Sequence, residues 1–412
     1  MKKNEELERQ LFLKQLQINR LLDITQAINN NVNVENLYTM YKSFLNWELG
    51  VRRLALLLPD NAGDWSCAVS DGCDAGLFDG CDFDAILPPF GNAIARLNGT
   101  IQPVLQQFDM IIPVFHKDEA IAYALIGDYD ASDFSKVQLI TTITNIIAVA
   151  IENKRLFKRQ IERERFNHEM TQAGKMQRSL VPDLNKLPQN GIFEVAAIYK
   201  PHFGVGGDYF DCFAFRDDRY LFVVADIAGK GLDAALLMAN FQANLHAIIR
   251  RAGTPEEFVR QLNRSVWRVT KSERYITMFL AEIDTKTRRL RYINAGHMPP
   301  VLILRGQEPQ VLTKGTTILG FFQSLPQVEI GELTLDDEAL LVIFTDGITD
   351  IRNPQGADFN EDLLTNFAAE NQQLGARTFN DTLMRRVEEF KHGEDFPDDI
   401  TVLTCRFFKP ND

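Results

Sequence analysis

The sequence contains few cysteines and no apolar run long enough to cross a membrane. Only five of its 412 residues are Cys, an odd number, and no two of them form a CxxC pair. This usage argues against a disulfide framework and favours a reducing cytoplasm. The N-terminal stretch MKKNEELERQ is charged and leads into an amphipathic pattern, not into a signal-peptide core. We therefore expect a cytoplasmic protein without a membrane-spanning segment.

Basic residues are outnumbered by acidic ones. The chain has 44 Lys and Arg against 56 Asp and Glu, a formal net charge of −12 at pH 7. This balance argues against nucleic acid as the main partner. A phosphorylated substrate would have to be attracted by metal ions or by local basic groups. The apolar share of 45% and the charged share of 24% are those of a globular protein. The length predicts two or three domains.

Three of the five cysteines, Cys67, Cys73 and Cys81, cluster in one loop-like stretch. They could hold a metal or sense redox state. However, their spacing matches no standard metal site, and no histidine lies near them in the sequence. Ordinary thiols are the competing interpretation.

The N-terminal half predicts helices around a small mixed module. Residues 1–19 carry apolar side chains at a spacing of three and four, typical of an amphipathic helix. Residues 20–150 alternate helical and strand-like stretches, with a helix expected from Gly91 to Leu97, and form an α+β module. A long helix is expected to begin near Phe134, capped by Ser132 or Asp133.

A charge-rich helical linker follows at residues 151–182 and ends at Pro182. Its apolar spacing runs to Ile161, slips, and resumes near Phe166. Two interpretations stay open: a solvated single helix, and a parallel two-helix coiled coil that joins two copies of the chain.

Strands dominate residues 183–412. Six short runs are rich in β-branched or aromatic residues, and they alternate with a few helices: FEVAAIY, YFDCFAF, YLFVVAD, ITMFLAEI, RLRYINA and PVLILR. This pattern predicts a β-sandwich with helices outside, not a parallel doubly wound sheet. The fold class is therefore α+β.

Acidic residues stand where several of these strands end. Asp208 follows two glycines, Asp226 ends the run LFVVAD, and Asp346 follows LLVIFT. The pair Asp398-Asp399 directly precedes the strand-like ITVLTCRFF. Carboxylates gathered from distant strands would build a metal centre from oxygen alone, which favours Mg²⁺ or Mn²⁺ over zinc. Two such ions can activate water and bind a phosphoryl oxygen.

These motifs identify a family resemblance. Residues 180–408 resemble the bacterial metal-dependent serine/threonine phosphatases of the type-2C (PPM) superfamily, in the SpoIIE/RsbU-like branch. The matching stretches are MQRSLVP at 176–182, VGGDYFD at 205–211, VADIAGKGLDAALLMA at 224–239, INAGHMPP at 293–300, FTDGITD at 344–350 and DDIT at 398–401. The resemblance implies an α/β/β/α sandwich that binds two Mn²⁺ or Mg²⁺ ions at one end.

The resemblance also assigns site residues. The positions that match metal ligands of the family are Asp208, Asp226, Ile227 through its carbonyl, Asp346 and Asp398. Asp226 is expected to bridge the two ions, and Asp399 is the fallback for the fourth carboxylate. Asp211 and Asp350 are interpreted as structural. The implied mechanism is in-line attack of a metal-activated water on phosphoserine or phosphothreonine.

Two further residues allow two interpretations each. No arginine lies near the GGD motif in the sequence. Lys230 therefore either binds the substrate phosphate or is a solvated residue at the start of a helix. His297 either donates a proton to the leaving oxygen or is a turn residue between two strands.

The resemblance extends to partners. The order of elements in residues 20–150 and the stretch AVAIENKRLF resemble a GAF domain, which implies an unknown small-molecule or protein ligand. The phosphatase resemblance implies an anti-anti-sigma (STAS-type) phosphoprotein as the substrate, and the linker predicts a homodimer. Two rival interpretations are a non-catalytic scaffold that uses the same fold, and a cyclic-dinucleotide synthase with GGDYF as its motif. The second lacks the acidic residue that such enzymes need where Tyr209 stands.

Overall fold

The structure of the chain is a computed structural model. It describes residues 2–60, 63–74, 76–87, 90–97, 100, 102–129, 134–202, 204–216 and 218–409. The chain divides into two compact units, residues 1–164 and 165–412. Within the described ranges, no helix combines the length and the apolar character needed to span a membrane.

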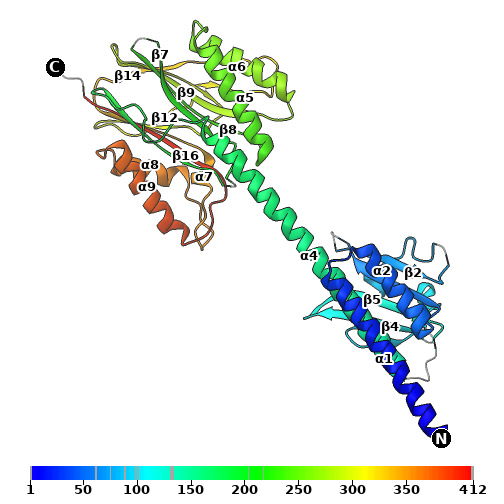
Figure 1. Ribbon diagram of the computed structural model, residues 1–412. Coiled ribbons are helices and arrows are strands. Elements are labelled where there is room, and N and C mark those ends of the chain that lie inside the picture. Colours follow the sequence, from blue (N-terminus) through cyan, green and yellow to red (C-terminus); the bar gives the residue numbers. More distant parts are fainter. Residues whose placement is uncertain are drawn as a thin grey trace. The chain divides into compact units, whose positions relative to one another are not determined.

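The first unit is built on a five-stranded antiparallel sheet (Figure 1). Its strands, in the order in which they lie side by side, are β2 (Trp65–Asp71), β1 (Arg53–Pro59), β5 (Glu119–Gly127), β4 (Met110–His116) and β3 (Ala95–Arg96). The helical elements are α1 (Lys2–Asn29), α2 (Val34–Ser43), η1 (Phe44–Glu48), α3 (Phe83–Ile86), η3 (Pro103–Leu105) and α4 (Phe134–Arg178).

Both faces of this sheet are covered, which follows from the alternation of side chains along its strands. In β1, Leu54 and Leu56 pack on one face with residues of α1, α2 and α4. Ala55 and Leu57 pack on the other face with residues of α3 and η3. The result is an α+β module with two apolar layers.

Several predicted boundaries differ from the observed elements. The helix expected from Gly91 to Leu97 is wrong: this stretch contains turns and the short strand β3, which pairs with β4 at Ala95 and Ile111. Pairing with a neighbouring strand decided the structure there. Helix α1 continues through residue 19 to Asn29, and α4 continues through residue 150. The expected caps Ser132 and Asp133 lie outside the described residues.

The second unit is a sandwich of two sheets. The first sheet has the order β13 (Gly315–Thr316), β10 (Arg289–Ala295), β9 (Ile276–Asp284), β8 (Arg219–Ile227) and β7 (Tyr209–Arg216), with β14 (Gly331–Thr334) also paired to β10. The second has the order β12 (Gln310–Val311), β11 (Val301–Leu304), β15 (Ala339–Phe344), β16 (Ile400–Phe407) and β6 (Phe193–Lys200).

Helices cover the outer face of each sheet. In Figure 1, α5 (Leu232–Ile249) and α6 (Pro255–Thr270) lie over the first sheet, and α8 (Glu361–Glu370) and α9 (Ala376–Lys391) over the second. The short helix α7 (Asp346–Thr349) follows β15 directly. This is the α/β/β/α layering that the resemblance implied.

The apolar layers hold the sandwich together. Between the sheets, Phe193, Phe222 and Phe407 form an aromatic cluster with ring centroids 5.6 to 6.2 Å apart. A separate layer buries Phe344 of β15 against Phe379 of α9. Because these layers fix both sheets, residues just beyond the strand ends are presented on a rigid frame.

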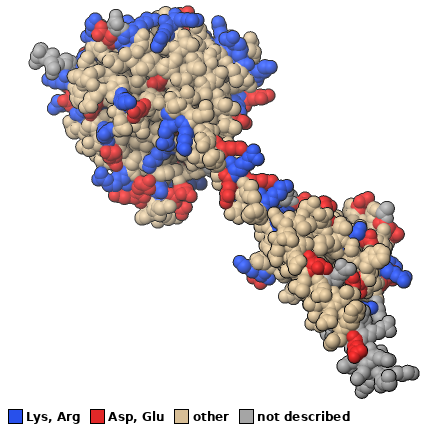
Figure 2. All heavy atoms as spheres, viewed as in Figure 1, with Lys and Arg blue, Asp and Glu red and all other residues tan. Residues whose placement is uncertain are grey.

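Charged side chains of both signs are spread over the face of each unit that Figure 2 shows.

Candidate metal centre

Acidic residues gather where strands of both sheets end. Strands β7 and β8 pair antiparallel with Tyr209 opposite Ala225, so Asp208 and Asp226 stand at the same end of the first sheet. In the second sheet Phe344 pairs with Val402, which places Asp346 beside the Asp398-Asp399 pair. The two ends are joined directly, because Asp208 of the first sheet bonds residues of the second.

Asp208 is buried and held by two hydroxyls. Its Oδ2 accepts a hydrogen bond from Thr345 Oγ1 at 2.8 Å and from Thr401 Oγ1 at 2.6 Å. Burial raises the pKa of Asp208 well above its ordinary range, and the charges of Asp226 and Asp399 raise it further. The two threonines therefore orient a carboxylate whose ionisation is unfavourable unless a cation lies beside it.

Asp399 positions the GGD loop. Its Oδ1 accepts from His202 N at 2.7 Å, and its Oδ2 accepts from Gly207 N at 2.7 Å. A Cβ atom on Gly206 would lie 2.3 Å from Asp399 Oδ2, so glycine is needed for this approach. Both oxygens of Asp399 are thus engaged with backbone, which favours Asp398 as the ligand of the pair.

Asp398 itself has a cationic neighbour. Its Oδ2 forms an ion pair of 2.8 Å with Lys230 Nζ, and its Oδ1 accepts from Asp399 N at 2.8 Å. Lys230 also donates to Pro397 O at 3.3 Å. In this structure Lys230 therefore serves as a counter-ion of the carboxylates, which is neither of the two interpretations weighed from the sequence.

Asp226 and the carbonyl of Ile227 face the GGD loop. A Cβ atom on Gly207 would lie 2.6 Å from Ile227 O and 3.5 Å from Asp226 Oδ1. Burial raises the pKa of Asp226 to about 7, helped by the charges of Asp346, Asp398 and Asp399 and opposed by Lys230. Burial likewise raises the pKa of Asp346, which also feels Asp350 and Asp398. These mutual effects show that the carboxylates are close neighbours.

The donor set fits hard divalent cations. The cluster supplies carboxylate and carbonyl oxygens, which Mg²⁺ and Mn²⁺ prefer. Mutual repulsion and burial disfavour the charged carboxylates, and a divalent cation would reverse both penalties. Within the described part of the chain, no group of three or more His, Cys, Asp or Glu side chains is already arranged to hold a metal ion. Coordination would therefore need side-chain movement, including that of Lys230.

Asp211, which was interpreted as structural, and His297 both have contacts within the fold, whereas the charge of Asp350 acts on Asp346 of the cluster. Asp211 accepts hydrogen bonds from Tyr209 Oη at 2.5 Å and from Cys212 N at 2.8 Å, away from the cluster. His297 is buried, and its Nδ1 lies 2.9 Å from Thr277 Oγ1. Burial lowers the pKa of His297 to about 4, so it is neutral near pH 7. These contacts favour the turn interpretation of His297 over proton donation.

The clustered cysteines are free thiols in the structure. Burial raises the pKa of Cys67 to about 11, which makes its reactive thiolate form scarce near neutral pH. Cys67 donates to a backbone carbonyl, that of Val69 at 3.5 Å. The contacts favour ordinary thiols.

Sequence reasoning missed the residues that orient the cluster. Thr345 and Thr401 lie within the stretches FTDGITD and DDIT, but only the acidic residues of these stretches were assigned a role. Gln177, near the end of α4, bonds the backbone of Gly206 from 29 residues away. Only its place within the stretch MQRSLVP hinted at a role.

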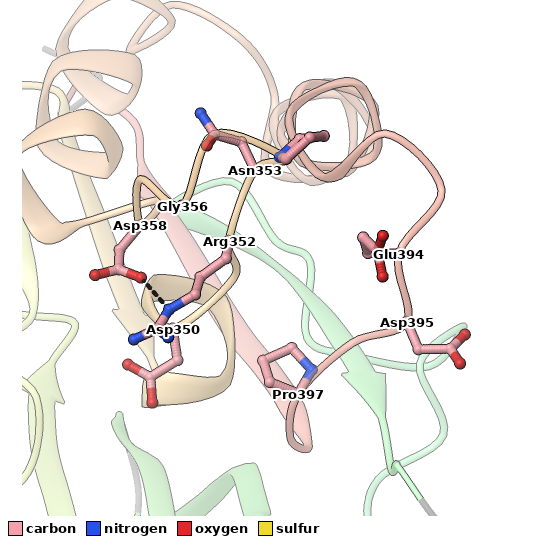
Figure 3. A pocket seen from close by; sticks show the side chains of 9 residues that line it. Asp350, Arg352, Asn353, Gly356, Asp358, Glu394, Asp395 and Pro397 are labelled. Carbon is pink, nitrogen blue, oxygen red and sulfur yellow. Dashed lines mark hydrogen bonds and ion pairs between the residues drawn. The ribbon is translucent and has the colours of Figure 1, made fainter.

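An open pocket of about 650 Å³ is lined by residues that lie close in sequence to Asp346 and Asp398 (Figure 3). It is lined by Asp350, Arg352, Asn353, Pro354, Gly356, Asp358, Glu394, Asp395 and Pro397. Arg352, the arginine of this lining, is paired with Asp358 at 2.9 Å. Four carboxylates would repel a phosphate dianion, so this pocket is not where a phosphate would bind.

Several known proteins are similar in sequence to this chain. Residues 216–408 match the family model of Stage II sporulation protein E (SpoIIE). The Phosphoserine phosphatase RsbU of Bacillus subtilis is 26% identical over 226 residues, which cover 54% of this chain and 65% of RsbU. Protein IcfG of Synechocystis is 26% identical over 238 residues, 50% of this chain and 37% of IcfG. The chain thus spans roughly a third to two thirds of these relatives.

A solved structure shares the fold. The SiaA-PP2C domain of Pseudomonas aeruginosa is 20% identical with a TM-score of 0.54, over 61% of this chain and 99% of that domain. The C-terminal unit therefore has the PP2C phosphatase fold. The match of residues 216–408 to the SpoIIE family model agrees with this fold.

Proposed function

We propose that the chain is a metal-dependent protein phosphatase that hydrolyses phosphoserine or phosphothreonine in a partner protein. The observation that carries this proposal is the gathering of Asp208, Asp226, Asp346 and Asp398 at one end of the sandwich. The match of residues 216–408 to the SpoIIE family model supports it.

The residues divide the work as follows. Two Mn²⁺ or Mg²⁺ ions bound here would supply an activated water and neutralise charge on the phosphoryl group. Asp226, with neighbours on both sheets, would hold both ions, and Ile227 would add its carbonyl. Asp208, oriented by Thr345 and Thr401, and Asp346 and Asp398 would complete the cluster. Asp399 would fix the GGD loop through Gly207.

The partner proposal follows the resemblance. RsbU is a phosphoserine phosphatase, and a phosphorylated anti-anti-sigma protein of the STAS type is the substrate that this branch of the family implies. We further propose residues 20–150 as a GAF-like sensor, with a small molecule or protein as its ligand, and residues 151–182 as the linker to a phosphatase domain at 183–412.

Exposed apolar side chains support a homodimer through the linker. On α4, Ile143, Ile147 and Ala150 are buried in the core of the first unit. Further along, Leu156, Phe157, Ile161 and Phe166 are exposed. A second copy of the helix would cover this stretch.

Metal-dependent hydrolysis is the test of the proposed function. The full chain should release phosphate from p-nitrophenyl phosphate and from a phosphoserine peptide in Mn²⁺, and a chelator should abolish release reversibly. The scaffold interpretation predicts no metal-dependent release from either substrate. A chelator-insensitive activity would contradict the metal mechanism.

Gln177, near the C-terminal end of α4, contacts the GGD loop of the site directly. Gln177 Oε1 accepts from Gly206 N at 3.0 Å, and its Nε2 donates to Gly206 O at 2.6 Å, both buried. Next to it, a Cβ atom on Gly174 would lie 2.0 Å from Gly204 O. Gly207, which follows Gly206 in the chain, donates its backbone N–H to Asp399. Any change at this end of the helix would therefore reach the metal loop.

Replacing Gln177 with Ala should raise the Mn²⁺ concentration for half-maximal activity about tenfold, because two buried backbone groups lose partners, at about 1–3 kcal/mol. Titration of activity with Mn²⁺ measures this. The matched control is Gln160→Ala, whose side-chain amide donates to Glu164 on the exposed surface of the same helix. Equal metal requirements in both variants would remove the linker from the control of the site.

A further inference from the structure

The loop between α6 and β9 places Arg274 beside the end of β8. Arg274 Nη1 donates to Ala228 O at 3.4 Å, across 46 residues of sequence. A Cβ atom on Gly229 would lie 2.3 Å from the same Nη1, and Gly229 has a φ of +115°. The guanidinium therefore lies where Gly229 has no side chain, two to three residues after Asp226.

The backbone holds Arg274 in this position. Ala228 N donates to Tyr275 O at 3.0 Å, which ties the loop to the residues after Asp226. Lys271 and Ser272 turn the chain in left-handed conformations, with φ of 47° and 70°. Ser272 Oγ then donates to Phe321 O at 2.7 Å. The base of the arginine is thus anchored on both sides.

The charges of the acidic cluster favour an additional cation beside it. Asp208, Asp226, Asp346, Asp398 and Asp399 carry five negative charges when ionised, and two divalent ions carry four positive ones. One negative charge would remain to oppose a phosphate monoester dianion. Lys230, which pairs with Asp398 at 2.8 Å, would bring this balance only to zero. A second positive group beside the cluster would make the site net positive, so that it attracts the dianion.

Arg274 can be released for this role. Its other partner is Asp233, with Nη2 and Oδ2 3.0 Å apart, and that carboxylate is 73% exposed. Exposed ion pairs contribute little free energy. A guanidinium can donate two parallel hydrogen bonds to two phosphate oxygens. The contact with Asp233, in contrast, joins one nitrogen to one oxygen. A phosphate can therefore replace Asp233.

We propose that Arg274 binds the phosphoryl oxygens of the substrate beside the metal cluster, exchanging its contact with Asp233 for the phosphate. The proposal rests on the proposed function, because it assigns a phosphate-binding residue to the same site. It also supplies the arginine that no motif near GGD provides.

Inorganic phosphate is the probe. With the full chain loaded with Mn²⁺, Arg274→Ala should weaken phosphate binding, measured by calorimetry and as product inhibition, about tenfold. The KM for a phosphoserine peptide should rise by a similar factor, while Mn²⁺ affinity stays within about twofold. Arg274→Lys should lose less, because it keeps the charge. Asp233→Ala should bind phosphate at least as tightly as the parent chain.

Arg268→Ala is the control, since Arg268 is exposed on α6 and its Nε donates to Arg264 O within that helix. Unchanged phosphate affinity in Arg274→Ala would overturn the inference. So would an equal loss of Mn²⁺ affinity in the Ala and Lys variants, because Arg274 would then only support the loop. If the parent chain binds Mn²⁺ and phosphate but hydrolyses nothing, the proposed function fails while phosphate binding still tests Arg274.

Discussion

Asp226→Asn should lower the Mn²⁺-dependent hydrolysis of a phosphoserine peptide about 1,000-fold. Burial raises the pKa of Asp226, and the charges of Asp346, Asp398 and Asp399 raise it further, so removing this carboxylate affects the whole cluster. An amide keeps the shape of the side chain but removes the charge that would hold both ions. Initial rates at saturating Mn²⁺, with calorimetry of Mn²⁺ binding, measure the effect.

The same variant should be more stable than the parent chain when no metal is present. The pKa of Asp226 is about 7, above its ordinary 3.8. Between these values the folded chain binds a proton that the unfolded chain does not, so stability falls as pH rises through this window. Asn does not titrate. Its advantage should therefore be a few degrees in melting temperature at about pH 8, and vanish near about pH 4.

Asp218→Asn is the matched control for both measurements. Asp218 lies in the turn at the opposite end of the β7–β8 hairpin, in a left-handed conformation that Asn also adopts readily. Its activity should equal that of the parent chain. Retention of metal-dependent activity in Asp226→Asn would contradict the assignment of this residue.

Gly207→Ala should have the second largest effect. A Cβ atom at this position would lie 2.6 Å from the carbonyl oxygen of Ile227, a backbone atom that cannot rotate away. The GGD loop would have to separate from the end of β8, which moves Asp208 away from Asp226. We expect Mn²⁺ affinity and activity to fall about 100-fold each.

Gly191→Ala is the control for this substitution. No atom lies within 4 Å of a Cβ placed on Gly191, which precedes β6, so the added methyl meets open space. Melting curves of both variants separate a local effect from unfolding. Full activity and unchanged Mn²⁺ affinity in Gly207→Ala would show that the GGD loop and β8 do not form one site.

Much of the C-terminal unit could be predicted from the sequence, because local patterns and motifs agree there. The run LFVVAD has β-branched and aromatic residues and then an acid, so both the strand and its functional end are visible. The layering of helices and sheets followed from the resemblance. The stretch from Gly91 to Leu97 shows the converse, since its strand exists only through pairing with β4.

The contacts that complete the site could not be predicted. Thr401 meets Asp208 across 193 residues, and Arg274 meets Ala228 across 46. Such pairs come from the packing of two sheets and from loop geometry, which have no periodicity along the chain. Gln177 is similar: its partner is the backbone of Gly206, which leaves no signature in side-chain types.

Crystals of the full chain grown with Mn²⁺ and measured at the manganese absorption edge would locate the ions themselves. We expect two anomalous peaks about 3.5–4 Å apart, bounded by Asp208, Asp226, Asp346 and Asp398, with Lys230 displaced from Asp398. If manganese were absent from this end of the sandwich and bound only elsewhere, these carboxylates would not form the metal centre.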